Sequence, residues 1–280
     1  MVKRLLAYIA IAIIIAFIMF PFIWIILTSL KFPVEIFSYP PTFIPKNPTL
    51  HAYKTILSKP DPEKVTEMPI MTNLLNSCVV AISTMFASVT IGSCAAYGFA
   101  RHKTKLAITI FVAILLMRTI SRITIAIPLY LMMRDVGLLN TKLAVIITHI
   151  TVTFPIVMFL MYSFFQDVPV ELEEAARVDG CSRLGTFLRI ILPLSAPGLA
   201  VASILAFLLS YNEFLFALVL LSNAETWTLP VALGSFIQQY KIAWDFLSAA
   251  GTIAIIPAVA AAFYLQKYII KGLALGAVKG

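Results

Sequence analysis

Six apolar stretches alternate with polar segments along the chain, and each is long enough to cross a lipid bilayer. They cover Leu5–Leu30, Leu74–Ala100, Leu106–Met133, Leu143–Phe165, Leu199–Leu221 and Phe246–Leu265. A helix rises about 1.5 Å per residue, so about 20 apolar residues suffice to cross a hydrocarbon core of about 30 Å. We therefore expect an all-α polytopic membrane protein with six transmembrane helices.

The composition supports this expectation. Hydrophobic residues make up 61% of the 280 residues and charged residues 12%, with a mean hydropathy of +0.97. Soluble domains carry about 25% charged residues. The first apolar stretch is too long for a secretory signal, and no small-residue cleavage site follows it, which indicates a spanning helix. The net charge of +8 fits basic residues that set topology and contact anionic lipid better than it fits nucleic-acid binding.

Two polar segments stand out between the apolar stretches. Residues 31–72 hold eight of the 16 prolines, which prevent a continuous helix and predict an exposed extracytoplasmic loop. Residues 167–197 form a long polar interruption. Pro169 and the glutamates after it mark the first turn of a helix, Gly180 suits its end, and Ser182 can cap a second helix. Such a helix pair is too polar to cross a bilayer and is well shaped to dock on a soluble partner.

The sequence gives little support for an enzyme. There is no glycine-rich motif followed by Lys and Ser or Thr, so we expect ATP to be hydrolysed elsewhere and no cofactor to be bound by this chain. The histidines and cysteines have no metal-ligand, redox or catalytic-triad spacing: His51, His102, His149, Cys78, Cys94 and Cys181. We expect no catalytic residue and no metal site.

Three charged residues interrupt the apolar stretches: Arg118, Arg122 and Glu213, the last preceded by Asn212. An ionised side chain near the bilayer centre costs roughly 2.5–3.5 kcal/mol on insertion scales, so each charge should face the bundle or water and find a partner. Arg118 and Arg122 are one helical turn apart, which predicts a shared helix face. Two interpretations stay open: these groups line or gate a pathway, or they make hydrogen bonds between helices.

The polar segment also carries a specific motif. It reads E-A-A-x3-G-x9-I-x-L-P, with Glu174, Ala175, Ala176, Gly180, Ile190, Leu192 and Pro193 at the defined positions. This pattern resembles the EAA loop of binding-protein-dependent ABC importer permeases, which have the type I permease fold. The resemblance implies that the loop fits into a cleft on an ATPase subunit and passes ATP-driven closure to the spanning helices. Asp179 would join Glu174, Ala175, Ala176 and Gly180 in that contact.

Further strings are similar to sugar permeases. They are Ile127–Tyr130, Gly137–Thr141 and Asn212–Leu218, although Tyr211 stands where Trp commonly precedes the asparagine. The ending, with Gly276, Val278, Lys279 and Gly280, resembles the smaller permease of the maltose and trehalose type. In that relative the tail reaches between two ATPase subunits; a frayed terminus is the alternative here. In the same relative, the loop that corresponds to segment 223–245 enters the cleft of the binding protein. The resemblance implies that Asn223, Glu225 and Trp227 contact a binding protein here; the alternative is a purely structural loop.

These expectations define an organisation for the whole chain. Residues 1–30 would be the first spanning helix, 31–72 the extracytoplasmic loop, 73–270 the permease domain, and 271–280 a cytosolic tail. With both termini cytoplasmic, 11 of the 21 Lys and Arg residues lie inside, which supports this orientation only slightly. The stronger argument is the EAA-like loop at residues 167–197, called the coupling loop below. The resemblance implies that it faces the cytoplasm, where ATP is bound.

The resemblance implies a prokaryotic cell-membrane location and several partners. These are a second homologous permease, two ATPase subunits that bind ATP and magnesium, an extracytoplasmic solute-binding protein, a sugar and the lipid bilayer, but no nucleic acid. Two alternatives remain. One is a secondary transporter that uses Glu213 as its intramembrane carboxylate. The other is an ABC permease for a solute such as glycerol phosphate or an amino acid.

Overall fold

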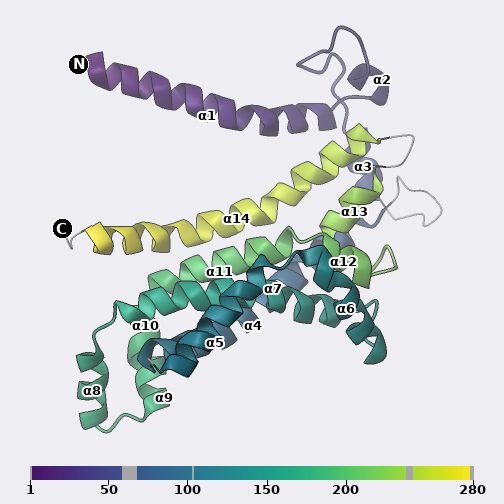
Figure 1. Ribbon diagram of the computed structural model, residues 1–280. Helices are drawn as coiled ribbons and strands as arrows, with labels where there is room; N and C mark the ends of the chain where they lie inside the picture. Colours follow the sequence, from purple (N-terminus) through teal and green to yellow (C-terminus); the bar gives the residue numbers. More distant parts are fainter. Residues whose placement is uncertain (1, 59–67, 103, 238–241, 278–280) are drawn as a thin grey trace. The chain divides into compact units, whose positions relative to one another are not determined.

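The computed structural model describes residues 2–58, 68–102, 104–237 and 242–277, and these are almost entirely helical. Their one pairing of extended backbone is an isolated bridge between Ile237 and Ile242. The chain divides into two compact units. One contains residues 1–74 and 229–256, and the other contains residues 75–228 and 257–280. Figure 1 shows the helices of both units, coloured along the sequence.

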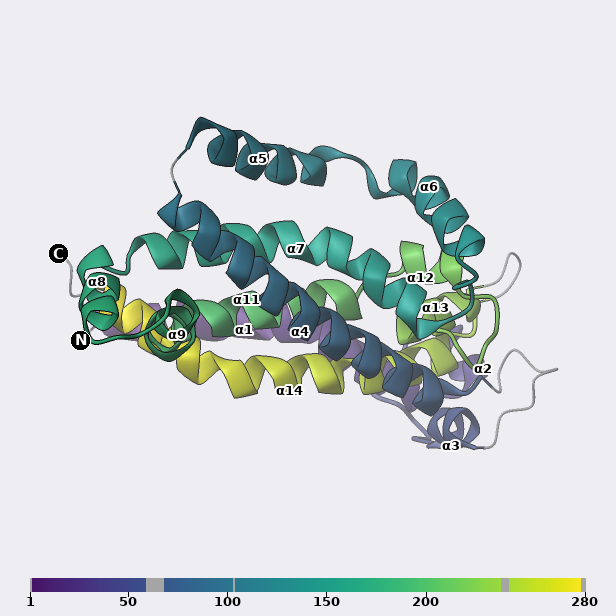
Figure 2. The ribbon, with the colours of Figure 1, turned by 90° about the horizontal axis from the view of Figure 1, so that it is seen from below.

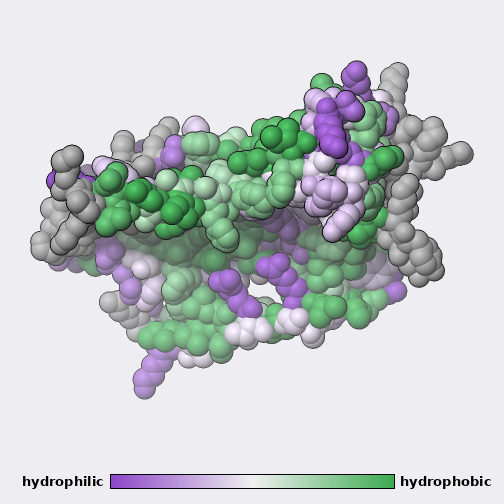
Figure 3. Space-filling model, turned by 90° about the horizontal axis from the view of Figure 1, so that it is seen from above, coloured by the Kyte–Doolittle hydropathy of each residue, from purple (hydrophilic) through white to green (hydrophobic). Residues whose placement is uncertain are grey.

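The first unit is built around the end of a long apolar helix. Its elements are α1 (Val2–Ser29), α2 (Pro33–Ile36), α3 (His51–Leu57), α13 (Leu229–Ser235) and the first part of α14 (Trp244–Ala277). The side chains of α1 are exposed from Arg4 to Ile23, so this helix presents an apolar surface suited to lipid or to another subunit. In the space-filling view most of the visible helix surface is hydrophobic (Figure 3).

The proline-rich segment is more ordered than the sequence suggested. The Lys31 ammonium donates to the Thr42 carbonyl and lies 4.9 Å from the Trp24 ring centroid. The hydroxyls of Ser29 and Tyr53 lie 2.8 Å apart and share a hydrogen bond. Within the predicted exposed loop, the short helices α2 and α3 form, and α3 buries Ala52 and Ile56.

The second unit contains the remaining helices. They are α4 (Ile70–Arg101), α5 (Lys105–Leu116), η1 (Met117–Thr119), α6 (Arg122–Asp135), α7 (Lys142–Gln166), α8 (Val170–Val178), α9 (Arg183–Thr186), η2 (Phe187–Ile191), α10 (Leu192–Leu194), α11 (Ala196–Tyr211) and α12 (Leu215–Leu220). Helices α7 and α11 run side by side (Figures 1 and 2). A Cβ at Gly198 would lie only 2.4 Å from the Phe164 ring, so glycine is needed where these helices approach closely.

Four of the described helices are long and apolar enough to cross a membrane, and there are up to six spans if each of two bent helix pairs counts as one. The four are Arg4–Ser29, Ile70–Arg101, Lys142–Gln166 and Trp244–Tyr264. The bent pairs are Lys105–Thr119 with Arg122–Asp135, at 102°, and Arg183–Leu194 with Ala196–Tyr211, at 80°. The all-α architecture predicted from the sequence is confirmed, but two of its spans are not straight helices.

The third apolar stretch breaks between its two arginines. Helix α5 ends in the 3₁₀ turn η1, Ile120 and Ser121 are extended, and α6 begins at Arg122. The Thr119 hydroxyl donates to the Leu116 carbonyl, a local bond that competes with continued helix. The two arginines therefore do not share one helix face, contrary to the prediction. Figure 2 shows α5 and α6 as separate rods joined by extended chain.

The fifth stretch is also interrupted. We predicted a helix over Leu199–Leu221, but α11 ends at Tyr211 and α12 begins at Leu215. The segment 223–245 was predicted as a polar loop, yet it contains α13, whose Leu229, Val231 and Ala232 are buried. The apolar run of this helix makes burial favourable. Helix α14 continues to Ala277, well beyond the span end predicted at Leu265.

Candidate functional site

The turn between α8 and α9 is fixed by a helix-capping motif. Gly180 has φ +87°, a left-handed conformation that glycine adopts without strain. Its amide donates to the Arg177 carbonyl at 3.1 Å, and the next amide, of Cys181, donates to the Ala176 carbonyl at 2.9 Å. These two bonds form a Schellman cap. The predicted turn at Gly180 between two helices is therefore confirmed.

Helix α8 has an inner and an outer face. The inner face buries Glu173 and Ala176, which are 8% and 5% exposed. The outer face follows helical spacing and consists of Glu171, Glu174, Ala175 and Val178, all exposed. Val178 is 87% exposed, so the described residues of this unit leave an apolar side chain uncovered between carboxylates. Of the two motif alanines, Ala175 therefore faces outward and Ala176 inward.

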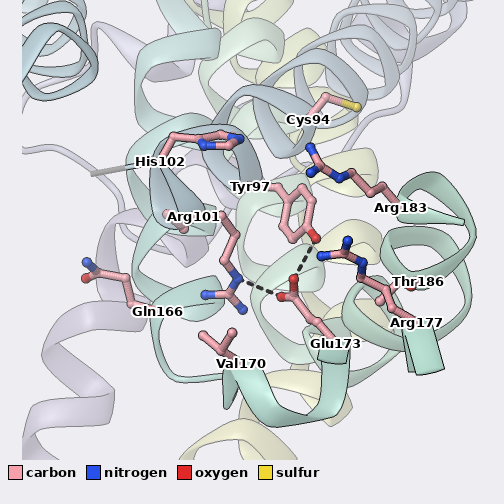
Figure 4. Close-up of a pocket in the computed structure, with 12 residues that line it drawn as sticks. Cys94, Tyr97, Arg101, His102, Gln166, Val170, Glu173, Arg177, Arg183 and Thr186 are labelled. Atoms are coloured by element: carbon pink, nitrogen blue, oxygen red, sulfur yellow. Dashed lines mark hydrogen bonds and ion pairs between the residues drawn. The ribbon is translucent and has the colours of Figure 1, made fainter. Parts of the chain in front are cut away.

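The inner face is tied to α4 by an ion pair that sequence reasoning missed. Arg101 Nε donates to Glu173 Oε1 at 2.6 Å, and the Tyr97 hydroxyl donates to Glu173 Oε2 at 2.8 Å (Figure 4). Arg101 also donates to the carbonyls of Phe165 and Val168, at 3.0 and 3.1 Å. One guanidinium thus joins the end of α4, the end of α7 and the inner face of α8. The sequence offered one indication of this ion pair. Helix α8 contains three glutamates within four residues, and these cannot all lie on the same side of a helix.

These groups stand in a cavity of about 660 Å³ on the inner side of α8. Arg177, Arg183 and Thr186 line it from the helix pair, while Cys94 and His102 line it from α4 and the residue after it (Figure 4). The cavity contains three arginines but one carboxylate, and that carboxylate is occupied by Arg101. The cavity is therefore basic apart from the ion pair.

The second helix of the loop leads into the core of the unit. The Ser182 hydroxyl accepts from the Gly185 amide at 3.1 Å, so the predicted cap is confirmed. Beyond it, α9, the π-helical turn η2 and α10 carry the chain to Leu194. Ile190 and Leu192 pack against the core around Phe165 and Phe187. Displacement of the loop would therefore move core helices as well.

The break between α11 and α12 is held by Glu213. Its carboxylate accepts from the backbone amides of Leu215, Phe216 and Ala217 at 3.0–3.4 Å. These amides belong to the first turn of α12, where backbone donors have no partner within the helix. His149 Nε2 lies 3.1 Å from Glu213 Oε2, and His149 Nδ1 lies 2.8 Å from Ser210 Oγ. Both glutamate and histidine are buried. Between the two interpretations of Glu213, this geometry favours interhelical bonding, with Asn212 bonded back to Leu208.

Arg118 and Arg122 instead face a small cavity. It measures about 90 Å³, and its other walls include Thr151 of α7 and Leu209 of α11. Both arginines are exposed, and the described residues provide neither with an ion pair or hydrogen bond. The break that separates the two residues along the chain still leaves them on one concave surface.

Residues 88–275 match a protein family described as the binding-protein-dependent transport system inner membrane component. The match extends over more than half of the chain and includes the capped loop. The chain belongs to this family. It is the membrane-spanning permease subunit of an ABC importer.

Individual relatives match nearly the whole length of this chain. The chain is 34% identical to the trehalose/maltose transport system permease protein MalG of Thermococcus litoralis, over 99% of this chain and 98% of that protein. It is also 34% identical to the sulfoquinovosyl glycerol transport system permease protein SmoH of Agrobacterium fabrum, over 98% and 94%. Its fold is similar to a chain of a bacterial ABC transporter involved in the import of the acidic polysaccharide alginate, with a TM-score of 0.77, 22% identity and coverage of 95% and 96%.

The opposite end of the permease unit holds the segment that resembles a binding-protein loop. Asn140 Oδ1 accepts from the amides of Ser222 and Asn223 and from the Thr226 hydroxyl. Asn76 Nδ2 donates to the carbonyls of Glu225 and Trp227 at 2.8 and 3.0 Å. Two asparagines thus fix the backbone of this segment, while the Glu225 side chain stays exposed. Its binding role stays a prediction.

The predicted tail contact lies at the end of the chain. Its residues Val278, Lys279 and Gly280 lie outside the described residues, and Gly276 belongs to the last turn of α14. Of the residues predicted to contact an ATPase, the structure therefore brings together those of the coupling loop.

Proposed function

We propose that this permease imports a sugar or sugar derivative delivered by a solute-binding protein, and that α8 couples transport to a separate ATPase. The main support for the coupling role is helix α8. It is capped at Gly180, it is anchored to α4 through Arg101, and its outer face is exposed. Relatives named for trehalose/maltose, sulfoquinovosyl glycerol and diacetylchitobiose transport support the sugar class.

The outer face of α8 suits a groove with basic rims. Glu171 and Glu174 present carboxylates, and Ala175 and Val178 form a small apolar surface between them. An apolar centre with charges at its edge is the usual composition of a protein interface. Asp179 and Gly180 at the end of the helix would complete the contact with the ATPase.

The buried ion pair makes α8 part of a rigid unit with the spanning helices. When ATP binding draws two ATPase subunits together, α8 moves with them, and Glu173 transmits this displacement to α4 and α7 through Arg101. A charge-assisted bond is suited to this role because breaking it inside the protein is costly. The pathway lies between this permease and a second homologous one.

The remaining assignments follow from this arrangement. Both termini face the cytoplasm, ATP and magnesium bind in the ATPase subunits, and this chain holds no cofactor. The solute-binding protein docks at the opposite end, where the fixed segment around Glu225 projects toward it. Glu213 is engaged by His149 and backbone amides, which disfavours the alternative of a secondary transporter that uses this carboxylate.

Uptake into right-side-out vesicles tests the proposal. Vesicles that contain the permease with its co-purifying subunits and binding protein should accumulate sugar only when ATP is inside, and an ionophore should leave the rate unchanged. Uptake that an ionophore abolishes and ATP does not affect would replace this proposal with the secondary-transporter reading.

A further inference from the structure

The cavity at the α5–α6 break contains two cations in the apolar part of the chain. Arg118 is 13 residues from the Lys105 end of α5, which places it roughly 20 Å along a core about 30 Å thick. A guanidinium at that depth is unfavourable unless water or an anion faces it. Arg118 and Arg122 place two such charges within five residues of the sequence.

Two carboxylates of the same unit already have partners. Glu213 accepts from His149 and three amides of α12, and Asp135 accepts from Arg134 at 2.9 Å. Neither is available to Arg118 or Arg122. Within the part of the chain that the structure describes, the two guanidinium groups therefore lack a counter-charge.

Both arginine side chains are exposed, and both stand at one cavity of the unit. They line a cavity with Thr151 and Leu209, whose helices pack together in the core of the unit. At the lower edge of Figure 3, hydrophilic side chains lie beside the hydrophobic surface of α5 and α6. A charge needed only at the lipid surface would point outward or toward a membrane boundary. Broken helices that face a cavity at membrane depth are also where transporters place their substrate sites.

We propose that Arg118 and Arg122 bind the acidic group of the transported molecule, so that the cargo is an acidic sugar carrying a carboxylate, sulfonate, sulfate or phosphate. This inference rests on the proposed function and specifies its substrate class. A guanidinium fits each of these groups because it can donate two parallel hydrogen bonds to two oxygens. The neutral Thr151 hydroxyl beside the pair adds no competing charge.

The electrostatic part can be tested without knowing the cargo. Ile120 lines the same cavity and is 46% exposed, so Ile120→Cys places a reporter there in a chain whose three cysteines are replaced by alanine. In the purified transporter, a sulfonate-bearing methanethiosulfonate should react about tenfold faster than a quaternary-ammonium analogue. The combination Arg118→Gln with Arg122→Gln should remove this preference. Arg134→Gln, at an exposed ion pair outside the cavity, is the matched control and should keep it.

The cargo part uses the chain with its native cysteines. Binding of digalacturonate and of neutral galactobiose is compared by equilibrium dialysis with the assembled transporter. We expect about a tenfold preference for digalacturonate, equivalent to about 1.4 kcal/mol, abolished by the double Gln variant and largely kept when both arginines become lysine.

Three results would overturn the inference. They are equal reactivity toward the two reagents, equal binding of the two sugars, or loss of the second permease from the double Gln variant, which would assign the arginines to subunit pairing. Failure of the proposed function looks different. In that case no ATPase co-purifies with any variant, while the reagent preference at Ile120→Cys is still measurable.

Discussion

Two arginine sites in the same unit differ in how their charge is satisfied. Arg101 donates to one carboxylate and two carbonyls, and joins three helices. Arg118 and Arg122 lie at a helix break, beside a cavity, without a described partner. The comparison shows that a charge with a complete set of partners holds the fold, whereas a charge without one is suited to binding a molecule that enters later.

The two helix breaks repeat this contrast. At the α11–α12 break, Glu213 accepts from the exposed amides and His149 supports it. At the α5–α6 break the side chains of Arg118 and Arg122 face a cavity instead. One break is closed by the protein itself, and the other leaves its charges for an outside partner.

The largest effect is expected from breaking the satisfied site. Arg101→Met leaves the Glu173 carboxylate buried without its cation, which should lower the free energy of unfolding by about 3–5 kcal/mol. Replacing both residues, with Arg101→Met and Glu173→Leu, should restore much of that loss, because two apolar groups need no partner. Thermal unfolding in detergent measures both.

The matched control is Arg134→Met. The Arg134–Asp135 pair has side chains that are 55% and 66% exposed, so its loss should cost about 0–1 kcal/mol. If Arg101→Met were as mild as Arg134→Met, the ion pair at α8 would not anchor the loop.

Replacing Gly180 by valine should separate a local strain from a functional effect. Gly137 ends α6 in the same cap, with φ +70°, and neither glycine has an atom within 4 Å of an added Cβ. Both valine variants should therefore lose about 1–2 kcal/mol from the strained backbone alone. Only Gly180→Val should also abolish ATP-driven uptake, because the ATPase no longer docks on α8. Equal loss of uptake with Gly137→Val would show that general destabilisation is responsible.

Neutralising Glu213 should have a smaller and purely structural effect. Glu213→Gln keeps one oxygen for the α12 amides but loses the charge that strengthens these bonds, at a cost of about 1–2 kcal/mol. Transport should slow in proportion to the folded fraction and stay insensitive to an ionophore. A change in ion dependence would reopen the secondary-transporter interpretation.

The smallest effect concerns pH at the proline-rich segment. The amide of Lys46 donates to Glu35, and this bond, with smaller help from the Thr42 hydroxyl and the Lys31 charge, holds the pKa of Glu35 below 4.5 despite partial desolvation. A depressed pKa stabilises the folded segment above 4.5 and loses that contribution as pH falls through the lower folded value. Exchange of the Lys46 amide should therefore accelerate at low pH, after correction for intrinsic rates. Glu35→Gln should remove this pH dependence; if the dependence persists, its source is another group.

The sequence predicted the architecture well where hydrophobic length decides it. The helices α4 and α7 were expected to within a few residues, as were the Gly180 turn and the Ser182 cap. It failed at Ile120 and Glu213, where continuous apolar composition hides a break that depends on local bonds and tertiary partners. The tail of α14 was likewise longer than its apolar part.

The candidate site was half predictable. The motif identified the loop, but the division of α8 into faces depends on what packs beneath it. Arg101 looked like a basic residue that ends a span, and only its distance from Glu173 reveals the anchor. Asn140 and Asn76 also escaped notice, because a single asparagine in a loop has no pattern to distinguish it.

The most direct test of coupling through α8 is recovery of the complex from membranes in mild detergent. A tag at the N-terminus retrieves the permease, and mass spectrometry identifies what stays bound to the native chain, to Gly180→Val and to Gly137→Val. The account predicts a Walker-motif ATPase and a second permease with the native chain and Gly137→Val, and loss of the ATPase with Gly180→Val. Recovery of the native chain alone, or as a homo-oligomer without ATPase, would contradict it.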